Sequence, residues 1–153
     1  MTTTRVRALL RTPSGALLLI RRTRPGAPPY WVFPGGGVEA ADSSLQDALV
    51  REVFEELAGA AVVGKLVYIL ERSAGPGHIE RELYFLATID RWSASERTGP
   101  EFARPGSGSY DCDEVPLTRA EVGSRQIRPA VVAQFLLAHC EALDELPALT
   151  CGQ

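Results

Sequence analysis

Three glutamates and an arginine, close together in the chain, carry the strongest chemical signal in this sequence. The chain reads Arg-Glu-Val-Phe-Glu-Glu from Arg51 to Glu56. On an α-helix, at about 100° per residue, Glu52, Glu55 and Glu56 fall within an arc of about 100°. Glu52 and Glu56 are i,i+4 neighbours of like charge, which destabilises a helix slightly unless something compensates. A divalent cation would compensate this repulsion.

Carboxylate oxygens are the ligands that Mg²⁺ prefers, and this ion often holds one or two carboxylates, several waters and substrate phosphates together. The acidic cluster therefore indicates phosphate chemistry with Mg²⁺ as the cofactor, or Mn²⁺ in its place. The alternative is that the glutamates simply face water, as most acidic side chains do. The residues around the glutamates distinguish a metal site from a solvated acidic surface.

The glutamates lie on a segment that is predicted to be a helix. Apolar residues recur there at every fourth position, at Leu45, Leu49, Val53 and Leu57, which gives one core-facing stripe. The polar residues 42–44 offer N-caps. Gly59 is expected to leave the helix in a left-handed conformation. The sequence therefore predicts a helix that ends near Ala58, with the acids beside its buried stripe.

A glycine-rich segment precedes this helix. Tyr30–Phe33 is predicted to be a short strand, and the run Pro34-Gly35-Gly36-Gly37 is predicted to be a loop. With the acids, this segment resembles the Nudix box: a glycine, five residues, Glu, seven residues, then Arg-Glu-hydrophobic-x-Glu-Glu-x-Gly-hydrophobic. The core of that box is matched one for one, by Arg51, Glu52, Val53, Glu55 and Glu56.

The first acidic position of the box can be aligned in two ways. Counting eight residues back from Arg51 reaches Ser43, where the box has Glu, and makes Gly37 the leading glycine. If the loop is one residue longer, Asp42 takes the acidic position and Gly36 the leading one. The sequence leaves both alignments open.

At its far end the box is displaced by one residue. Ala58 stands where the box has glycine, and Gly59 stands where it has a hydrophobic residue. The box covers roughly Gly36 to Gly59. The resemblance implies an α/β protein with the Nudix fold, an α/β/α sandwich around a mixed β-sheet. We expect a single domain over residues 1–147 and a frayed tail over residues 148–153.

The rest of the chain offers the elements of such a fold. Apolar and aromatic runs predict strands at Arg5–Arg11, Ala16–Arg21, Ala61–Leu70, Arg81–Ile89 and Tyr110–Leu117. Turn residues make the first two strands a hairpin, and Gly75-Pro76-Gly77 separates the next two. Pro129 suits a first helical turn, and apolar residues follow it with helical spacing as far as Leu143. Residues 93–109 are predicted to form a long surface loop.

The resemblance implies hydrolysis of a diphosphate linkage in a nucleoside diphosphate-type substrate, by attack of water on phosphorus. It assigns Glu52, Glu55 and Glu56 to Mg²⁺ and makes Glu52 a candidate general base. Arg51 would orient a ligating carboxylate, as second-layer partners of metal sites do. A catalytically inactive nucleotide-sensing or regulatory domain with the same fold is the alternative, and the intact acids count against it. Isomerisation of a diphosphate would need a cysteine near the box, and none lies there.

Residues outside the box complete the expected site. Glu101 lies in the predicted surface loop, where lids and extra ligands tend to reside, and is expected to act with the box acids. Other acids that compete for this role are Glu82, Asp111, Asp113 and Glu114. Arg22 is expected to reach a substrate phosphate, and Gly36 and Gly37 are expected to contact the substrate.

Charge and composition limit the partners. A formal net charge of -3 argues against a broad basic surface for duplex nucleic acid, whereas a small phosphorylated, nucleotide-derived substrate needs only a few cations.

The cysteines Cys112, Cys140 and Cys151 have no zinc or disulfide-framework spacing. No apolar run reaches the roughly 18 residues of a membrane span. We expect a cytoplasmic protein that does not enter membranes, as a monomer or a homodimer.

Overall fold

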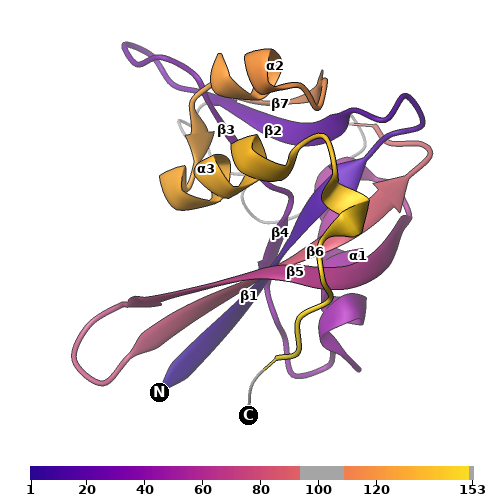
Figure 1. The fold of residues 1–153 in the computed structure, drawn as a ribbon. Helices are drawn as coiled ribbons and strands as arrows, with labels where there is room; N and C mark the ends of the chain where they lie inside the picture. The colour runs from indigo at the N-terminus through magenta and orange to yellow at the C-terminus, as the bar shows by residue number, and fades with distance from the viewer. Residues whose placement is uncertain (94–108, 152–153) are drawn as a thin grey trace.

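One mixed β-sheet runs through the molecule, and helices cover both of its faces (Figure 1). The structure is a computed structural model that describes residues 1–93 and 109–151. Its strands are β1 (Thr2–Arg11), β2 (Leu17–Thr23), β3 (Tyr30–Val32), β4 (Gly35–Gly37), β5 (Ala61–Ser73), β6 (Ile79–Ile89), β7 (Ser109–Val115) and β8 (Ile127–Arg128). Its helices are α1 (Leu45–Leu57), α2 (Arg119–Gly123), α3 (Ala130–His139) and the 3-10 turn η3 (Leu143–Glu145). Apart from its two end residues, the predicted surface loop over 93–109 lies outside the described residues.

The sheet divides at strand β1. Its strand order is β5-β6-β1-β2-β3-β8, with β4 paired to β1 and β7 paired to β2. On one side, β1 pairs in parallel with β6 along its whole length. On the other side, β4 pairs with residues 5–7 of β1, and β2 pairs with β1 only at Arg11. Strands β3 and β8 are also parallel, whereas β5 and β6 are antiparallel. The predicted mixed sheet is confirmed.

The buried side chains form two cores, one on each face of the sheet. Along β1, Val6, Ala8 and Leu10 face the first core. Leu9 faces the second core, as the alternation of side chains along a strand requires. Helix α1 packs on the first core through its apolar stripe, and α2 and α3 pack on the second. The predicted α/β/α sandwich is therefore confirmed.

Helix α1 forms where the sequence predicts it, and one feature of its exit differs. The Ser44 side chain caps its start by accepting a hydrogen bond from the Asp47 amide at 3.0 Å. The left-handed residue at its end is Ala58, with φ of 51°, and not Gly59 as predicted. Gly59 is needed for a different reason, because a Cβ there would lie 2.2 Å from the carbonyl oxygen of Arg91.

The glycine run is a strand and not the predicted loop. Residues Gly35–Gly37 form β4 and pair with residues 5–7 of β1. The prediction failed because glycine is unfavourable in strands unless another group approaches the backbone closely. Such an approach occurs here, since a Cβ on Gly36 would lie 2.5 Å from the Glu52 carboxylate. Strand β4 therefore brings the backbone of the box next to the acidic face of α1.

Both predicted hairpins are present, and the second is longer than predicted. Strands β1 and β2 are antiparallel neighbours, as are β5 and β6. The β5–β6 hairpin continues past the apolar residues because Glu71 and Arg81 face each other across the strands as an ion pair, 2.6 Å apart. In Figure 1 the tip of this hairpin and the N-terminus extend beyond the helices.

The C-terminal part departs most from the predicted elements. Strand β7 is followed by α2 and by one more strand, β8, and both are too short to show a period in the sequence. Pro129 is the N-cap of α3, and α3 ends at His139, so Leu143 lies in η3. Two residues of the predicted tail contact the sheet: the Leu149 amide donates to the Leu66 carbonyl at 2.8 Å, and Arg81 Nη1 donates to Cys151 Sγ at 3.8 Å. None of the helices in the described ranges is long and apolar enough to cross a membrane.

Candidate active site

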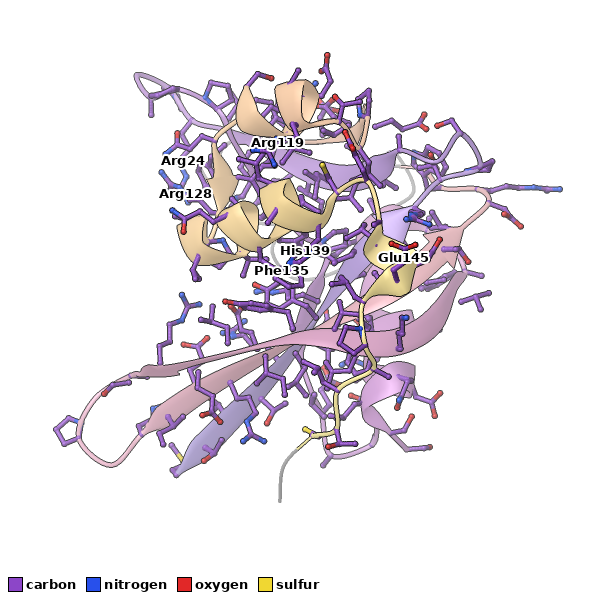
Figure 2. All side chains as sticks on the ribbon, viewed as in Figure 1. Arg24, Arg119, Arg128, Phe135, His139 and Glu145 are labelled. Carbon is purple, nitrogen blue, oxygen red and sulfur yellow. The ribbon has the colours of Figure 1, made fainter. Side chains whose placement is uncertain are left out.

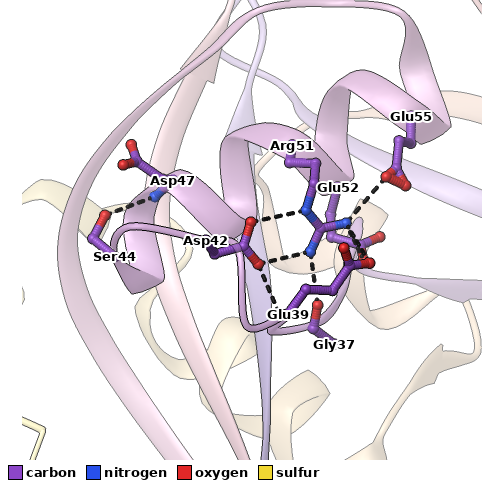
Figure 3. A network of polar contacts seen from close by, with 8 residues as sticks. All are labelled: Gly37, Glu39, Asp42, Ser44, Asp47, Arg51, Glu52 and Glu55. Atoms are coloured by element: carbon purple, nitrogen blue, oxygen red, sulfur yellow. Dashed lines mark hydrogen bonds and ion pairs between the residues drawn. The ribbon is translucent and has the colours of Figure 1, made fainter.

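Arg51 lies at the centre of the acidic cluster (Figure 3). Its Nη1 atom donates to Glu52 Oε1 at 3.1 Å and to Glu55 Oε2 at 3.0 Å. The same atom lies 3.3 Å from Glu39 Oε2. Its Nη2 atom donates to the carbonyl of Gly37 at 2.9 Å. The arginine of the box thus orients two of the predicted metal ligands and ties the helix to β4.

Asp42, and not Ser43, is the acid that faces Arg51. Asp42 accepts hydrogen bonds from Arg51 Nε at 2.9 Å and from Nη2 at 3.0 Å, and its Oδ2 also accepts from the Glu39 amide at 2.7 Å. Its side chain is 7% exposed, whereas Ser43 is exposed. The geometry therefore favours the alignment in which the loop is one residue longer and Asp42 takes the acidic box position.

These hydrogen bonds shift the ionisation of both partners. The Arg51 guanidinium, and after it the Glu39 amide, hold the pKa of the Asp42 carboxyl below its usual value. In turn Asp42 raises the pKa of Arg51, with smaller contributions from Glu55 and Glu52. Asp42 and Arg51 therefore remain a charged pair at neutral pH.

Glu56 is fixed by the backbone of β4. Its Oε1 atom accepts a hydrogen bond from the Gly35 amide at 2.8 Å. Glu52 lies against the next residue, Gly36, where only a residue without a Cβ leaves room for its carboxylate. Both expected ligands therefore contact β4, and the close approach of Glu52 to Gly36 explains in physical terms why the box has a glycine there.

The carboxylates of this site are of the ligand type that Mg²⁺ binds, although they do not converge on a single metal position. The carboxylates gathered at Arg51 and β4 belong to Glu39, Asp42, Glu52, Glu55 and Glu56. Arg51 supplies one positive charge against these five negative charges, and hard oxygen donors in excess are what Mg²⁺ binds. Within the described residues, no three acidic, histidine or cysteine side chains converge on a single metal position. Arg51 itself lies between the acids.

Arg22 contacts aromatic rings. Its guanidinium carbon lies 4.5 Å from the ring centroid of Tyr110 and 5.8 Å from that of Tyr30, and it also donates to the Tyr110 hydroxyl. As far as the chain is described, its contacts do not include the box acids. Its expected contact with a substrate phosphate stays a prediction.

The described acidic residues on β7, outside the box, bind residues that do not belong to the box. Asp111 and Asp113 form ion pairs with Arg21, at 3.2 and 2.9 Å. Asp113 also accepts from the Trp31 indole, and Glu114 accepts from Ser14 at 3.1 Å. Glu101 lies outside the described residues. Its expected role in the site therefore stays a prediction.

A cavity of about 470 Å³ lies on the face of the sheet opposite α1, and the sequence did not indicate it. Phe33 and Tyr84, whose ring centroids are 5.4 Å apart, form part of its wall. Arg7 also lines the cavity and is the register partner of Gly35, the residue that donates to Glu56. The cavity and the carboxylates thus lie on opposite faces of the sheet and are linked through the backbone pairing of Arg7 with Gly35. A signal was present in the sequence, because Arg7 interrupts an otherwise apolar stretch of a central strand.

A match to a protein-family model identifies the family of this chain. Residues 1–131 match the model of the NUDIX domain. This chain belongs to the Nudix family. The match covers most of the chain and the whole box, and it confirms both the resemblance and the prediction of a Nudix hydrolase. Among curated proteins none matches the sequence.

Solved structures of Nudix proteins are similar to this chain over most of its length. The ORF135 protein of E. coli is 25% identical, with 94% of this chain and 91% of that chain covered and a TM-score of 0.61. A NUDIX hydrolase from Nitrosomonas europaea is 17% identical, with 100% and 97% covered and a TM-score of 0.66. The NUDIX domain of Shewanella oneidensis NrtR, solved with ADP ribose, is 19% identical, with 94% and 89% covered and a TM-score of 0.62. These likenesses confirm the Nudix fold.

Proposed function

We propose that this protein hydrolyses the diphosphate linkage of a nucleotide-derived small molecule, with Mg²⁺ or Mn²⁺ as cofactor, at the acidic face of α1. The observation that carries the proposal is the position of Arg51, which holds Glu52 and Glu55 beside β4 and leaves four negative charges in excess. Such an excess is unfavourable unless a cation joins it. A solvated acidic face would need neither this network nor the glycines beneath it.

The phosphorus of a diphosphate is shielded by negative oxygens, so its hydrolysis needs positive charge on those oxygens and a positioned water. Glu52, Glu55 and Glu56 are the residues that would hold the metal. When bound there, Mg²⁺ supplies charge neutralisation of the phosphates and activation of water. Arg51 keeps two of these carboxylates oriented, and the Gly35 amide keeps the third in place. Glu52 and Glu101 are the candidates for the general base.

The cavity beside β4 is the place for the organic part of the substrate. Its aromatic wall of Phe33 and Tyr84 offers apolar surface for a planar or sugar-like group. The NUDIX domain of the Shewanella oneidensis protein was solved with ADP ribose, which supports a nucleotide-derived molecule as substrate. We place this activity in one domain over residues 1–147, in the cytoplasm. None of the cysteines, all within the described ranges, forms a disulfide.

A substrate panel tests this proposal. Nucleoside triphosphates, dinucleoside polyphosphates, nucleotide sugars, ADP-ribose and coenzyme A are incubated with the protein and Mg²⁺, and the products are identified by mass. We expect cleavage at a diphosphate linkage of at least one of them, and no cleavage with excess chelator. Turnover that is unaffected by the chelator would contradict the role of the metal. Binding of a nucleotide without turnover of any compound would instead favour a sensing or regulatory domain.

A further inference from the structure

The polar part of the cavity beside β4 holds an excess of positive charge. Glu82 lies at its base with a side chain only 4% exposed. It accepts from Arg7 Nε at 3.2 Å through Oε2 and from Arg72 Nη2 at 3.0 Å through Oε1. The Tyr84 hydroxyl also donates to Oε1, at 3.3 Å. One buried carboxylate thus fixes two guanidinium groups on the cavity wall.

A third arginine lines the same cavity. Arg128, on β8, stacks on the ring of Tyr30 with 4.0 Å between its guanidinium carbon and the ring centroid. Figure 2 shows it at the N-terminal end of α3. Arg7, Arg72 and Arg128 give three positive charges against the single negative charge of Glu82. No other charged residue lines the described part of this cavity.

The two arginines at Glu82 keep hydrogen-bond donors for a ligand. Arg7 uses its Nε on Glu82, and Arg72 uses one Nη atom. A guanidinium has five N–H donors in a planar fork that matches the oxygens of a phosphate. Because Glu82 already holds both groups, less conformational entropy is lost when they bind an anion. A phosphate monoester, with a charge of about −1.5 to −2 at pH 7, matches the excess charge of the cavity.

We propose that this cavity binds a second phosphate group, carried as a phosphate monoester on the organic part of the substrate and separate from the diphosphate that is cleaved. The inference rests on the proposed function, since it takes the cavity as the seat of the rest of the substrate. It names the substrate class: a diphosphate compound whose nucleoside or other organic part bears an additional phosphate. Arg7 and Arg72 contact that phosphate, and Glu82 positions them.

Calorimetric titration in excess chelator tests this inference apart from hydrolysis, because without a metal the carboxylate cluster repels phosphate. The probes are adenosine, adenosine 2′-monophosphate and adenosine 3′-monophosphate. We expect at least one monophosphate to bind about tenfold more tightly than adenosine, with the difference decreasing as salt is added. Equal affinity for adenosine and both monophosphates would overturn the inference, even if the protein hydrolyses diphosphates. A preference for a monophosphate in a protein that cleaves nothing would leave the phosphate site of the cavity standing and refute the hydrolase.

Three variants locate the binding. Arg72→Gln, in a side chain that is 47% exposed and therefore tolerant of substitution, should weaken binding of the preferred monophosphate about tenfold and leave adenosine binding nearly unchanged. Arg7→Gln should do the same if its circular dichroism spectrum shows a folded protein. The matched control is Arg119→Gln, which removes one positive charge from a surface side chain that bonds the Leu137 carbonyl outside the cavity. Loss of the preference in Arg119→Gln, or its retention in Arg72→Gln, would overturn the assignment.

Discussion

Arg51 and Asp42 are joined by two parallel hydrogen bonds, from Nε to Oδ1 at 2.9 Å and from Nη2 to Oδ2 at 3.0 Å. This bidentate pair ties the loop after β4 to the middle of α1. It also fixes the plane of the guanidinium, because both edges of the fork are engaged. The remaining Nη1 atom then points to Glu52 and Glu55. The orientation of the expected metal ligands thus depends on an acid outside the helix.

Replacement of Asp42 tests this dependence. Asp42→Asn keeps the shape of the side chain but removes the charge that holds Arg51, so Glu52 and Glu55 lose their common partner in a fixed position. We expect turnover to fall about tenfold or more. Ser43→Ala, in the exposed neighbouring residue, should retain wild-type turnover. The opposite ranking in steady-state kinetics would restore the alignment in which Ser43 holds the acidic box position.

Gly36 offers a test of the contact between β4 and Glu52. A Cβ at this position would lie 2.5 Å from the Glu52 carboxylate, which is the mobile end of its side chain and can rotate away. Gly36→Ala should therefore change the free energy of unfolding little but lower turnover about tenfold or more. Gly123→Ala at the end of α2 is the comparison, because a Cβ there makes only an ordinary contact, 3.7 Å from Leu137 Cδ1. Equal losses in the two variants would show that the position of Glu52 does not matter.

Ala58 carries a conformational cost that glycine would remove. It is the one residue other than glycine with a positive φ in the described chain, and the left-handed conformation costs an L-residue about 1–2 kcal/mol. Ala58→Gly should raise the free energy of unfolding by about 1 kcal/mol, measured by urea denaturation. Ala60→Gly, outside the helix and without a positive φ, should lower it by about 0.5 kcal/mol. A destabilised Ala58→Gly protein would refute this explanation of the helix exit.

Much of the fold could be predicted because its signals are local. The stripe of α1, the turn between β1 and β2 and the Gly-Pro-Gly turn of the second hairpin each depend on residues close together in the chain. The helix exit was predicted one residue late, because nothing about an alanine at position 58 indicates the left-handed conformation. The pairing of β4 was missed because it depends on β1, some 30 residues earlier.

The site was predicted only as far as the box extends. Arg51 and its glutamates lie within two turns of one helix, so spacing alone places them together. The cavity wall is assembled from β1, β3, β5, β6, β8 and the start of α3, and no local pattern joins Arg7, Arg72 and Glu82. Arg22 is assigned to the substrate because it is cationic, and its tyrosine neighbours on the adjacent strands could not be predicted because they come from other parts of the chain.

Glu101 is the acid outside the box that we expect to join the metal cluster. Glu101→Gln should lower turnover more than Glu96→Gln, a matched change in the same segment of the sequence. The reason is that a second carboxylate near the reacting phosphorus contributes as a ligand or as a general base. The rates of both variants are compared under saturating Mg²⁺. Equal rates would move this role to another acid, with Asp111 and Glu114 tested next.

The most direct measurement is the turnover of Glu52→Gln and Glu56→Gln on the best substrate of the panel with saturating Mg²⁺. Both changes keep side-chain shape and helix propensity, and the amide oxygen introduced by Glu56→Gln can still accept from the Gly35 amide. The free energy of unfolding without metal should stay equal or rise slightly, because like-charge repulsion is relieved. Turnover should nevertheless fall about a hundredfold or more, on the order of 3 kcal/mol of transition-state stabilisation. Glu121→Gln on α2 should keep wild-type turnover. Wild-type turnover in both α1 variants, with normal circular dichroism spectra, would contradict the catalytic role of this helix.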